Sequence, residues 1–412
     1  MPNIDPTTLD LLRLTLTPGL GPVLVGRAIA TCGSPEAVLR APGAQLKHIK
    51  GIGPDKARLI HDGIAASEAL AAEELALATS LGVTMIGIFE PGYPPLLKQI
   101  PDPPPVLYVR GWLRFADADR YPVGIVGSRS ATAYGTEQAE RFAAHLAQAG
   151  LTIVSGGARG IDTAAHRAAI RVKGRTIAVL GCGMTNCYPP ENAPLFDQII
   201  GSSDAGNGAI ISELPLRTAP HADNFPARNR IISGLSLGVL VVEAGRRSGA
   251  LITARIAAED HGREVFALPS RVDSTAAEGS LDLIKKGGAA VVTHPGDILD
   301  ALESPARHHH SGTHAAITAD PAREEGALFN ALDNHERPGS PGVPQTNRGD
   351  GVRDSGLSDS QRVVLAALSE PRSMDELARE TGLEVATLRA DVTVLEVRRR
   401  VRRMGSKVAL AQ

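Results

Sequence analysis

The chain has 412 residues, more than one ordinary domain contains, and 43% of them are hydrophobic, so it can bury a sizeable core. Its 43 basic and 45 acidic residues give a net charge of −2, which excludes nucleic-acid binding through a global positive field. No apolar run reaches the length of a membrane span and the N-terminus lacks a signal pattern, so we expect a cytoplasmic protein with no membrane partner. Its three cysteines lack C-x-x-C spacing, which predicts neither disulfides nor a zinc site.

Residues 1–84 are rich in alanine and leucine at helical spacing and predict a small helical domain. Two short glycine turns, at 18–22 and 50–54, resemble the helix-hairpin-helix pattern of SAM-like domains. Around the second turn, the residues expected to pack two helices together are Leu46, Ile49, Ile52, Ala57 and Ile60. Glycine amides in such turns can hold a DNA phosphate without contacting bases. A non-specific DNA clamp and a purely structural domain therefore both stay open.

Residues 85–121 are rich in proline and are predicted to form an irregular connector packed on the next domain. From residue 122 the pattern changes to two consecutive strand-and-helix units. The strands are predicted at 123–126 and 151–154, and the helices at 134–149 and 161–170. Because each buried, β-branched strand is followed by a helix, the two strands are expected to be parallel neighbours.

Each of these strands ends in a glycine-rich turn that carries an arginine, Arg129 in the first turn and Arg159 in the second. A turn between a parallel strand and a helix presents free backbone N–H groups to an anion, and arginine adds charge-assisted contacts. The turns therefore indicate phosphate binding, although neither matches the P-loop or the dinucleotide fingerprint. The alternative is that the glycines only form tight turns.

Further strands are predicted at 176–180, 209–212, 238–242, 264–268 and 290–292, most of them separated by helices. Seven such strands predict an α/β fold with a doubly wound, Rossmann-like parallel sheet over residues 122–303. In this fold the ligand crevice lies beyond the carboxyl ends of the strands.

The segment 225–235 combines an aromatic residue with basic ones. Phe225 can stack on a base while Arg228, Asn229 and Arg230 bind flanking phosphates, which is the combination that single-stranded nucleic acid requires. The alternative is a helix start with Phe225 in the core.

Residues 304–356 are polar and rich in glycine and proline, and they predict a flexible linker. Its histidines lack nearby acidic residues or cysteines, so we assign no metal. Residues 357–412 predict a winged-helix-like domain, with Ser373 and Glu376 as a capping box and Gly382 ending that helix. The arginines near residue 400 form a basic wing, and contacts to DNA or to a protein both stay open.

Six segments together resemble the bacterial DNA-processing protein A family, also called DprA or Smf: GSRSATAYG, SGGARGID, GCGMTNCYPPEN, SELPLRTAPHADNFPARNRIISGL, VVEAGRRSGALITA and REVFALPSRVDSTAAEGSLDLIKKGGA. The resemblance implies a non-catalytic protein without a cofactor that binds single-stranded DNA. It also implies a mediator that protects incoming DNA in natural transformation, helps to load the RecA recombinase and acts as a homodimer.

The resemblance also implies a phosphate-binding pocket with Arg228, Asn229 and Arg230 at its rim and Phe225 nearby. The remaining residues of this predicted pocket are Ser128, Arg129, Ser155, Gly156, Gly157, Arg159, Ser248, Gly249 and Thr253. This chain departs from the family pattern at Ala250, Ser270 and Leu281, which lie on the far wall of that pocket.

Two other classes of protein remain as alternatives. The first is a nucleotide-binding enzyme similar to the phosphoribohydrolases, with Glu213 or Glu243 as the catalytic carboxylate. The second is a sequence-specific regulator that binds DNA through the winged helix, which would leave the central domain without a role.

Overall fold

The computed structural model describes residues 4–201, 207–309, 359–368, 372–383, 401–404 and 407–410, together with the single positions 388, 392 and 395. The chain divides into two compact units, Met1–Arg337 and Pro338–Gln412, which are taken separately below. None of the helices in the described ranges is both long and apolar enough to cross a membrane.

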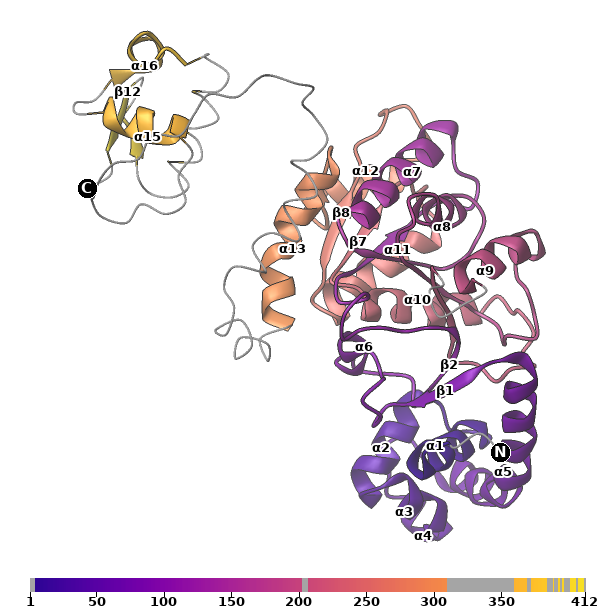
Figure 1. Cartoon of the computed structure of the whole chain (residues 1–412). Helices are drawn as coiled ribbons and strands as arrows, with labels where there is room; N and C mark the ends of the chain where they lie inside the picture. Colours follow the sequence, from indigo (N-terminus) through magenta and orange to yellow (C-terminus); the bar gives the residue numbers. More distant parts are fainter. Residues whose placement is uncertain are drawn as a thin grey trace, which may run out of the picture. The chain divides into compact units, whose positions relative to one another are not determined.

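The first unit begins with a helical domain (Figure 1), whose helices are α1 (Pro6–Leu16), α2 (Pro22–Cys32), α3 (Pro35–Arg40), α4 (Gly43–Leu46) and α5 (Pro54–Leu81). The two glycine turns join α1 to α2 and α4 to α5. Gly19 and Gly51 have φ angles of 85° and 97° in these turns, a conformation that side chains with a Cβ rarely adopt. All five apolar residues predicted to pack around the second turn are buried.

A nine-stranded sheet follows, with the strand order β1-β2-β6-β5-β4-β3-β7-β8-β9. Its seven parallel strands confirm the predicted doubly wound fold, with ends that differ from the prediction by at most one residue: β3 (Pro122–Val126), β4 (Thr152–Ser155), β5 (Thr176–Val179), β6 (Gly208–Ser212), β7 (Gly238–Val241), β8 (Glu264–Ala267) and β9 (Ala290–Val291). The chain winds from β3 to β6 in one direction and resumes at β7 on the other side of β3. The strand order therefore reverses between β3 and β7.

The predicted irregular connector is corrected in part, because it contains two strands and a short helix. They are β1 (Thr84–Gly87), α6 (Pro95–Lys98) and β2 (Val106–Gly111). Strand β2 pairs antiparallel with both β1 and β6, so the connector extends the sheet. Its prolines lie outside the run from Val106 to Val109, whose four side chains are all buried. An apolar run of this kind forms a strand when its flanking prolines stay outside the ladder.

Helices cover both faces of the sheet (Figure 1). One face packs against α7 (Ala133–Gln148), α8 (Ile161–Arg171) and α13 (Pro295–His309), and the other packs against α6, α10 (Asn224–Leu235) and α11 (Gly249–Arg255). Successive strand residues alternate between the two cores, with Leu240 on the first face and Val239 and Val241 on the second. The remaining elements of this domain are η1 (Pro190–Asn192), α9 (Ala193–Ile200), the single π turn η2 (Ile256–Asp260) and α12 (Glu278–Lys285).

Helix α13 continues to His309, so it occupies the start of the predicted linker, and the rest of that linker lies outside the described residues. The second unit contains α15 (Asp359–Ala366), α16 (Met374–Thr381) and a three-stranded sheet of β10 (Arg372–Ser373), β12 (Lys407–Leu410) and β11 (Val401–Met404). Ser373 and Glu376 form the predicted capping box, and Gly382 ends α16 in the left-handed conformation. Most of the predicted third helix and the arginines at 398–400 lie outside the described residues.

Candidate functional site

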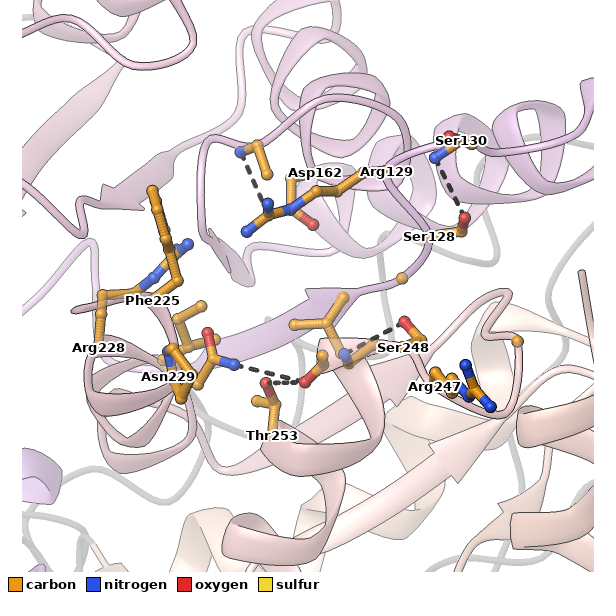
Figure 2. A pocket seen from close by; sticks show the side chains of 18 of the residues that line it. Ser128, Arg129, Ser130, Asp162, Phe225, Arg228, Asn229, Arg247, Ser248 and Thr253 are labelled. Carbon is orange, nitrogen blue, oxygen red and sulfur yellow. Dashed lines mark hydrogen bonds between the residues drawn. The ribbon is translucent and has the colours of Figure 1, made fainter. Parts of the chain in front are cut away.

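A pocket of about 770 Å³ lies beyond the carboxyl ends of β3 and β7. The turn after β3 and the turn after β7 form two of its walls, and the first turns of α10 and α11 complete it (Figure 2). This is the point where the strand order reverses, which is where doubly wound sheets bind their ligands. The pocket is therefore in the crevice that the sequence predicted.

The predicted site residues divide into two groups. Those that line the pocket are Ser128, Arg129, Phe225, Arg228, Asn229, Ser248, Gly249 and Thr253. Those that do not line it are Ser155, Gly156, Gly157, Arg159 and Arg230. The first group comes from three separate segments of the sequence that only the fold brings together.

Arg129 and Phe225 face each other at the pocket. The Cζ atom of Arg129 lies 5.0 Å from the centroid of the Phe225 ring, within the range of a cation–π contact. The ring of Tyr188 lies 5.3 Å from that of Phe225, tilted by 44°. Phe225 is only partly buried and belongs to none of the core clusters of the described residues, so it is not the core residue of the alternative interpretation. Arg129 is exposed and forms no ion pair with any described residue.

Arg228 brings a second positive charge to the pocket from a buried position. Its Nη1 donates a hydrogen bond to the carbonyl oxygen of Val179 at 2.8 Å. Burial lowers the pKa of Arg228 to about 10, and the nearby Asp162 carboxylate opposes that shift. The guanidinium is therefore still protonated at neutral pH.

Asp162 is the one acidic residue among those that line the pocket. Its Oδ2 accepts hydrogen bonds from the N–H groups of Gly156 at 3.1 Å and Ala158 at 3.3 Å. Burial raises the pKa of Asp162 above its usual 3.8, and the positive charge of Arg228 acts in the opposite direction. Asp162 thus closes the turn after β4 and balances part of the charge of Arg228.

The wall opposite Arg129 presents hydroxyl and amide groups beside Arg247 (Figure 2). The Ser248 Oγ accepts a hydrogen bond from the N–H of Ala250 at 3.3 Å and caps α11. The carbonyl oxygen of Gly249 accepts hydrogen bonds from Asn229 Nδ2 at 3.4 Å and from Thr253 Oγ1 at 3.5 Å. The predicted departure at Ala250 therefore lies on this wall, where the N–H of Ala250 contacts the cap.

Several lining residues were absent from the prediction, namely Ser130, Asp162, Tyr188, Arg246 and Arg247. Arg247 is exposed and forms no ion pair within the described ranges, whereas Arg246 pairs with Glu278 at 3.1 Å. Both arginines lie in the glycine turn after β7. The rule that singled out Arg129, an arginine in a turn that follows a parallel strand, also identifies them.

The second glycine turn, residues 155–160, lines the pocket at Ala158, and its other residues named in the prediction support the pocket without lining it. Ser155 is buried and its Oγ donates a hydrogen bond to the carbonyl oxygen of Ile125 at 2.6 Å. A Cβ on Gly157 would lie 2.9 Å from the Phe196 ring, so that position has no room for a side chain. Arg159 forms an ion pair with Glu191, with its Nη2 at 3.1 Å from Oε2. Ser155 and Gly157 therefore have structural roles in this turn.

The predicted rim position of Arg230 is also corrected. Its side chain is 9% exposed and forms ion pairs with Asp102 at 2.8 Å and Glu213 at 2.6 Å. Two residues apart on a helix, side chains point in roughly opposite directions. Because Arg228 faces the pocket, Arg230 faces the connector instead.

Both carboxylates of the enzyme alternative hold structural contacts. Glu243 is buried, and its carboxylate accepts hydrogen bonds from the Thr132 N–H at 2.8 Å and the Thr132 Oγ1 at 2.7 Å. Glu213 is paired with Arg230. Across the described part of the chain, no group of three or more histidine, cysteine or acidic residues is placed to hold a metal.

Fold and pocket together define a doubly wound α/β protein with an arginine-lined pocket where the strand order reverses. The family model described as DNA recombination-mediator protein A matches residues 84–303, and the DprA winged helix domain matches residues 353–407. The chain belongs to this DNA recombination-mediator family. The resemblance, the winged helix and the role of recombination mediator predicted from the sequence are thereby confirmed.

Two relatives and a solved structure show how far the similarity extends. The protein Smf of Synechocystis sp. is 39% identical over 320 residues, which are 75% of this chain and 75% of the relative. The protein Smf of Escherichia coli is 48% identical over 211 residues, 51% of this chain and 54% of the relative. The X-ray structure of DNA processing protein A from Streptococcus pneumoniae is 32% identical and covers 72% of this chain and 98% of that chain, with a TM-score of 0.61.

Proposed function

We propose that the chain binds single-stranded DNA in the pocket between β3 and β7, without catalysis and without a cofactor. In this proposal it protects incoming DNA in natural transformation and helps to load the RecA recombinase. The observation that carries the proposal is the pair of Arg129 and Phe225, an exposed cation and an aromatic ring in one pocket. Family membership supports the same role.

The chemistry of the pocket suits a strand with unpaired bases. Every base has a face that stacks on an aromatic ring, and guanidinium groups stack on bases as well as binding phosphates. Phe225 and Arg129 offer both contacts side by side, and Arg247 places a further exposed charge on the opposite wall. Bases in a duplex are paired and stacked on their neighbours, so they reach such a pocket only at the cost of opening the helix.

Non-catalytic binding is supported by the states of Glu213 and Glu243, which are held by Arg230 and Thr132. A carboxylate that is committed to structural hydrogen bonds is a poor general base. Family membership also supports the proposed partners, RecA and a second copy of this chain, and a cytoplasmic location.

Titration of the full chain with matched single- and double-stranded oligonucleotides over a salt series tests the proposal. We expect tighter binding of the single strand, with log affinity falling by about 0.7 per phosphate contact for each unit of log salt. Equal affinity for both forms would overturn it. Release of free base from nucleoside monophosphates would favour the phosphoribohydrolase alternative, and selective binding of one duplex sequence would favour the regulator.

A further inference from the structure

The helical domain contacts the loop between β6 and α10, which comprises residues 213–223. Leu216, in the middle of this loop, is fully buried and belongs to the same core cluster as Leu11 and Leu12 of α1. A residue that the chain reaches only after β6 is therefore part of the core of the N-terminal domain. Leu216 therefore fixes the loop 213–223, which belongs to the doubly wound domain, to the helical domain.

Glu74 of α5 holds the backbone at the same point. It is only 6% exposed, and its Oε1 accepts a hydrogen bond from the N–H of Leu216 at 2.6 Å. It forms no ion pair with a described residue, so this backbone donor is a main partner of a buried carboxylate. A hydrogen bond to a charged acceptor is about twice as strong as a neutral one. Burial first, and then the charge of Glu74, raise the pKa of Tyr108 on β2 well above its usual value.

The hydrogen bonds continue from Leu216 toward the pocket. The carbonyl oxygen of Leu216 accepts from the Thr185 N–H at 3.0 Å and from the Thr185 Oγ1 at 2.7 Å. The carbonyl oxygen of Thr218 accepts from the Gly183 N–H at 2.8 Å. These bonds fasten the loop 181–188 onto the loop 213–223. The loop 181–188 ends in Tyr188, which lines the pocket beside Phe225.

The loop 213–223 itself leads into the pocket. Pro220 and Ala222 line it, and α10 with Phe225 follows directly. At its other end, Glu213 is tied to Arg230 of α10. The loop is therefore held at two points. One is the ion pair of Glu213 and Arg230 inside the doubly wound domain. The other is Leu216 in the core of the helical domain, and together they set the position of the aromatic wall.

We propose that Glu74 is a positioning residue for the pocket, and that the helical domain serves through it as a support of the aromatic wall formed by Tyr188 and Phe225. The inference rests on the proposed function, because its main readout is binding of single-stranded DNA. Linkage makes the coupling reciprocal: a strand bound in the pocket slows opening of the contact between Glu74 and Leu216. A contact that only stabilised the helical domain would leave affinity unchanged.

The test compares Glu74→Ala with Glu74→Gln in the full chain, well below the unfolding temperature of either. Glutamine keeps an oxygen that accepts from the Leu216 N–H, whereas alanine removes it. We expect Glu74→Ala to bind a single-stranded oligonucleotide about tenfold more weakly and Glu74→Gln to stay within about threefold of the unmodified chain. Amide hydrogen exchange in 181–188 and 213–223 should become faster in Glu74→Ala only.

Val38→Ala is the matched control, because Val38 is buried in the same helical domain but lies on α3, which packs on α1 and α2. It should lower thermal stability and leave the affinity and the exchange of both loops unchanged. Unaltered affinity in Glu74→Ala overturns the inference, and so does an equal loss in Val38→Ala. If the unmodified chain binds no oligonucleotide, the proposed function fails, and unaltered exchange of 181–188 in Glu74→Ala then overturns the positioning role independently.

Discussion

The guanidinium of Arg228 occupies the space in which a side chain at Gly156 would stand. A Cβ at position 156 would lie 1.9 Å from Arg228 Nη1 and 2.6 Å from its Cζ. The first glycine of the turn after β4 therefore makes room for the buried cation of the pocket. Its contribution to the site is the space that it leaves for Arg228.

Gly156→Ala should displace Arg228 and break its hydrogen bond to Val179. Overpacking of this kind lowers the free energy of unfolding by about 1–3 kcal/mol, and affinity for single-stranded DNA should fall with it. The measurement is urea unfolding followed by oligonucleotide titration. The control is Gly26→Ala in α2, where a Cβ meets no atom within 4 Å, and here stability should rise by about 0.5–1 kcal/mol. Equal stability of the two variants would contradict this account of Gly156.

Arg129→Ala should weaken binding of single-stranded DNA about tenfold without changing stability, because the side chain is exposed and lies over the Phe225 ring at the pocket. The plot of log affinity against log salt should become shallower by about 0.7, the value for one lost phosphate contact. Arg171→Ala removes the same charge at the far end of α8, on a side chain paired with Glu140. An effect of equal size in Arg171→Ala would show that Arg129 acts only through net charge.

Arg230→Ala should mainly destabilise the protein. It leaves the Glu213 carboxylate nearly buried without its partner, and burial already raises the pKa of Glu213. Removing one member of a buried pair lowers the free energy of unfolding by on the order of 3 kcal/mol. Adding Glu213→Gln should restore part of the loss, since the unpaired charge is then absent. Denaturant unfolding of both single variants and the double variant measures this coupling, and strict additivity would argue against it.

The parallel part of the sheet was predictable from the sequence, because a strand buried on both faces is a nearly continuous apolar run. All five residues of β3 are buried, and the same holds for β6. Strand β2 was missed for a different reason. Its run Val106–Val109 is equally apolar, but the prolines before it suggested an irregular connector, and pairing with β1 and β6 determines its conformation.

The site was predictable where a local rule determines the geometry. Arg129 lies in a turn that must open toward the carboxyl edge of the sheet, so its position follows from the sequence. Arg228 and Arg230 look alike in the sequence, because both are basic residues near Phe225. The direction of each side chain depends on how α10 is rotated about its axis against the sheet. That rotation depends on residues far away in the sequence, such as Asp102. Gly156 matters because it leaves space for the Arg228 guanidinium. The two residues are far apart in the sequence, so their contact was not predictable from it.

Binding should tighten as the pH falls through the range in which Asp162 takes up a proton. Its pKa is raised above 3.8 by burial, so the folded protein binds this proton more readily than the unfolded chain does. The contribution of Asp162 to stability therefore rises as the pH falls through the folded pKa. Protonation also removes the only negative charge among the residues that line the pocket, while the phosphates of DNA keep theirs.

Asp162→Asn tests this pH dependence. Asparagine keeps an oxygen that can accept from the Gly156 N–H but carries no charge, so affinity at neutral pH should rise and its dependence on pH should flatten. Fluorescence titrations from about pH 7 to about pH 4 give the profile, because this range lies above the usual aspartate pKa of about 3.9, on the side to which burial shifts the pKa of Asp162. A steep profile that persists in the variant would assign the dependence to another group.

The last prediction concerns the two compact units, Met1–Arg337 and Pro338–Gln412. Every residue that lines the pocket lies between Val126 and Thr253, well inside the first unit. A chain that ends at His309, the last residue of α13, should therefore fold and bind single-stranded DNA. Ending the chain before Pro295 instead removes Ile298, Leu299 and Leu302 from the core beneath α13, and this shorter chain should be insoluble or markedly less stable.

The comparison with the full chain separates the two roles left open for the winged helix. If the basic residues of the tail bind DNA, the full chain releases more counterions, and its plot of log affinity against log salt is steeper than that of the chain ending at His309. If the tail contacts a protein instead, the two plots coincide. Loss of single-strand binding at low salt in a folded chain ending at His309 would contradict the prediction, because the main DNA site would then lie beyond α13.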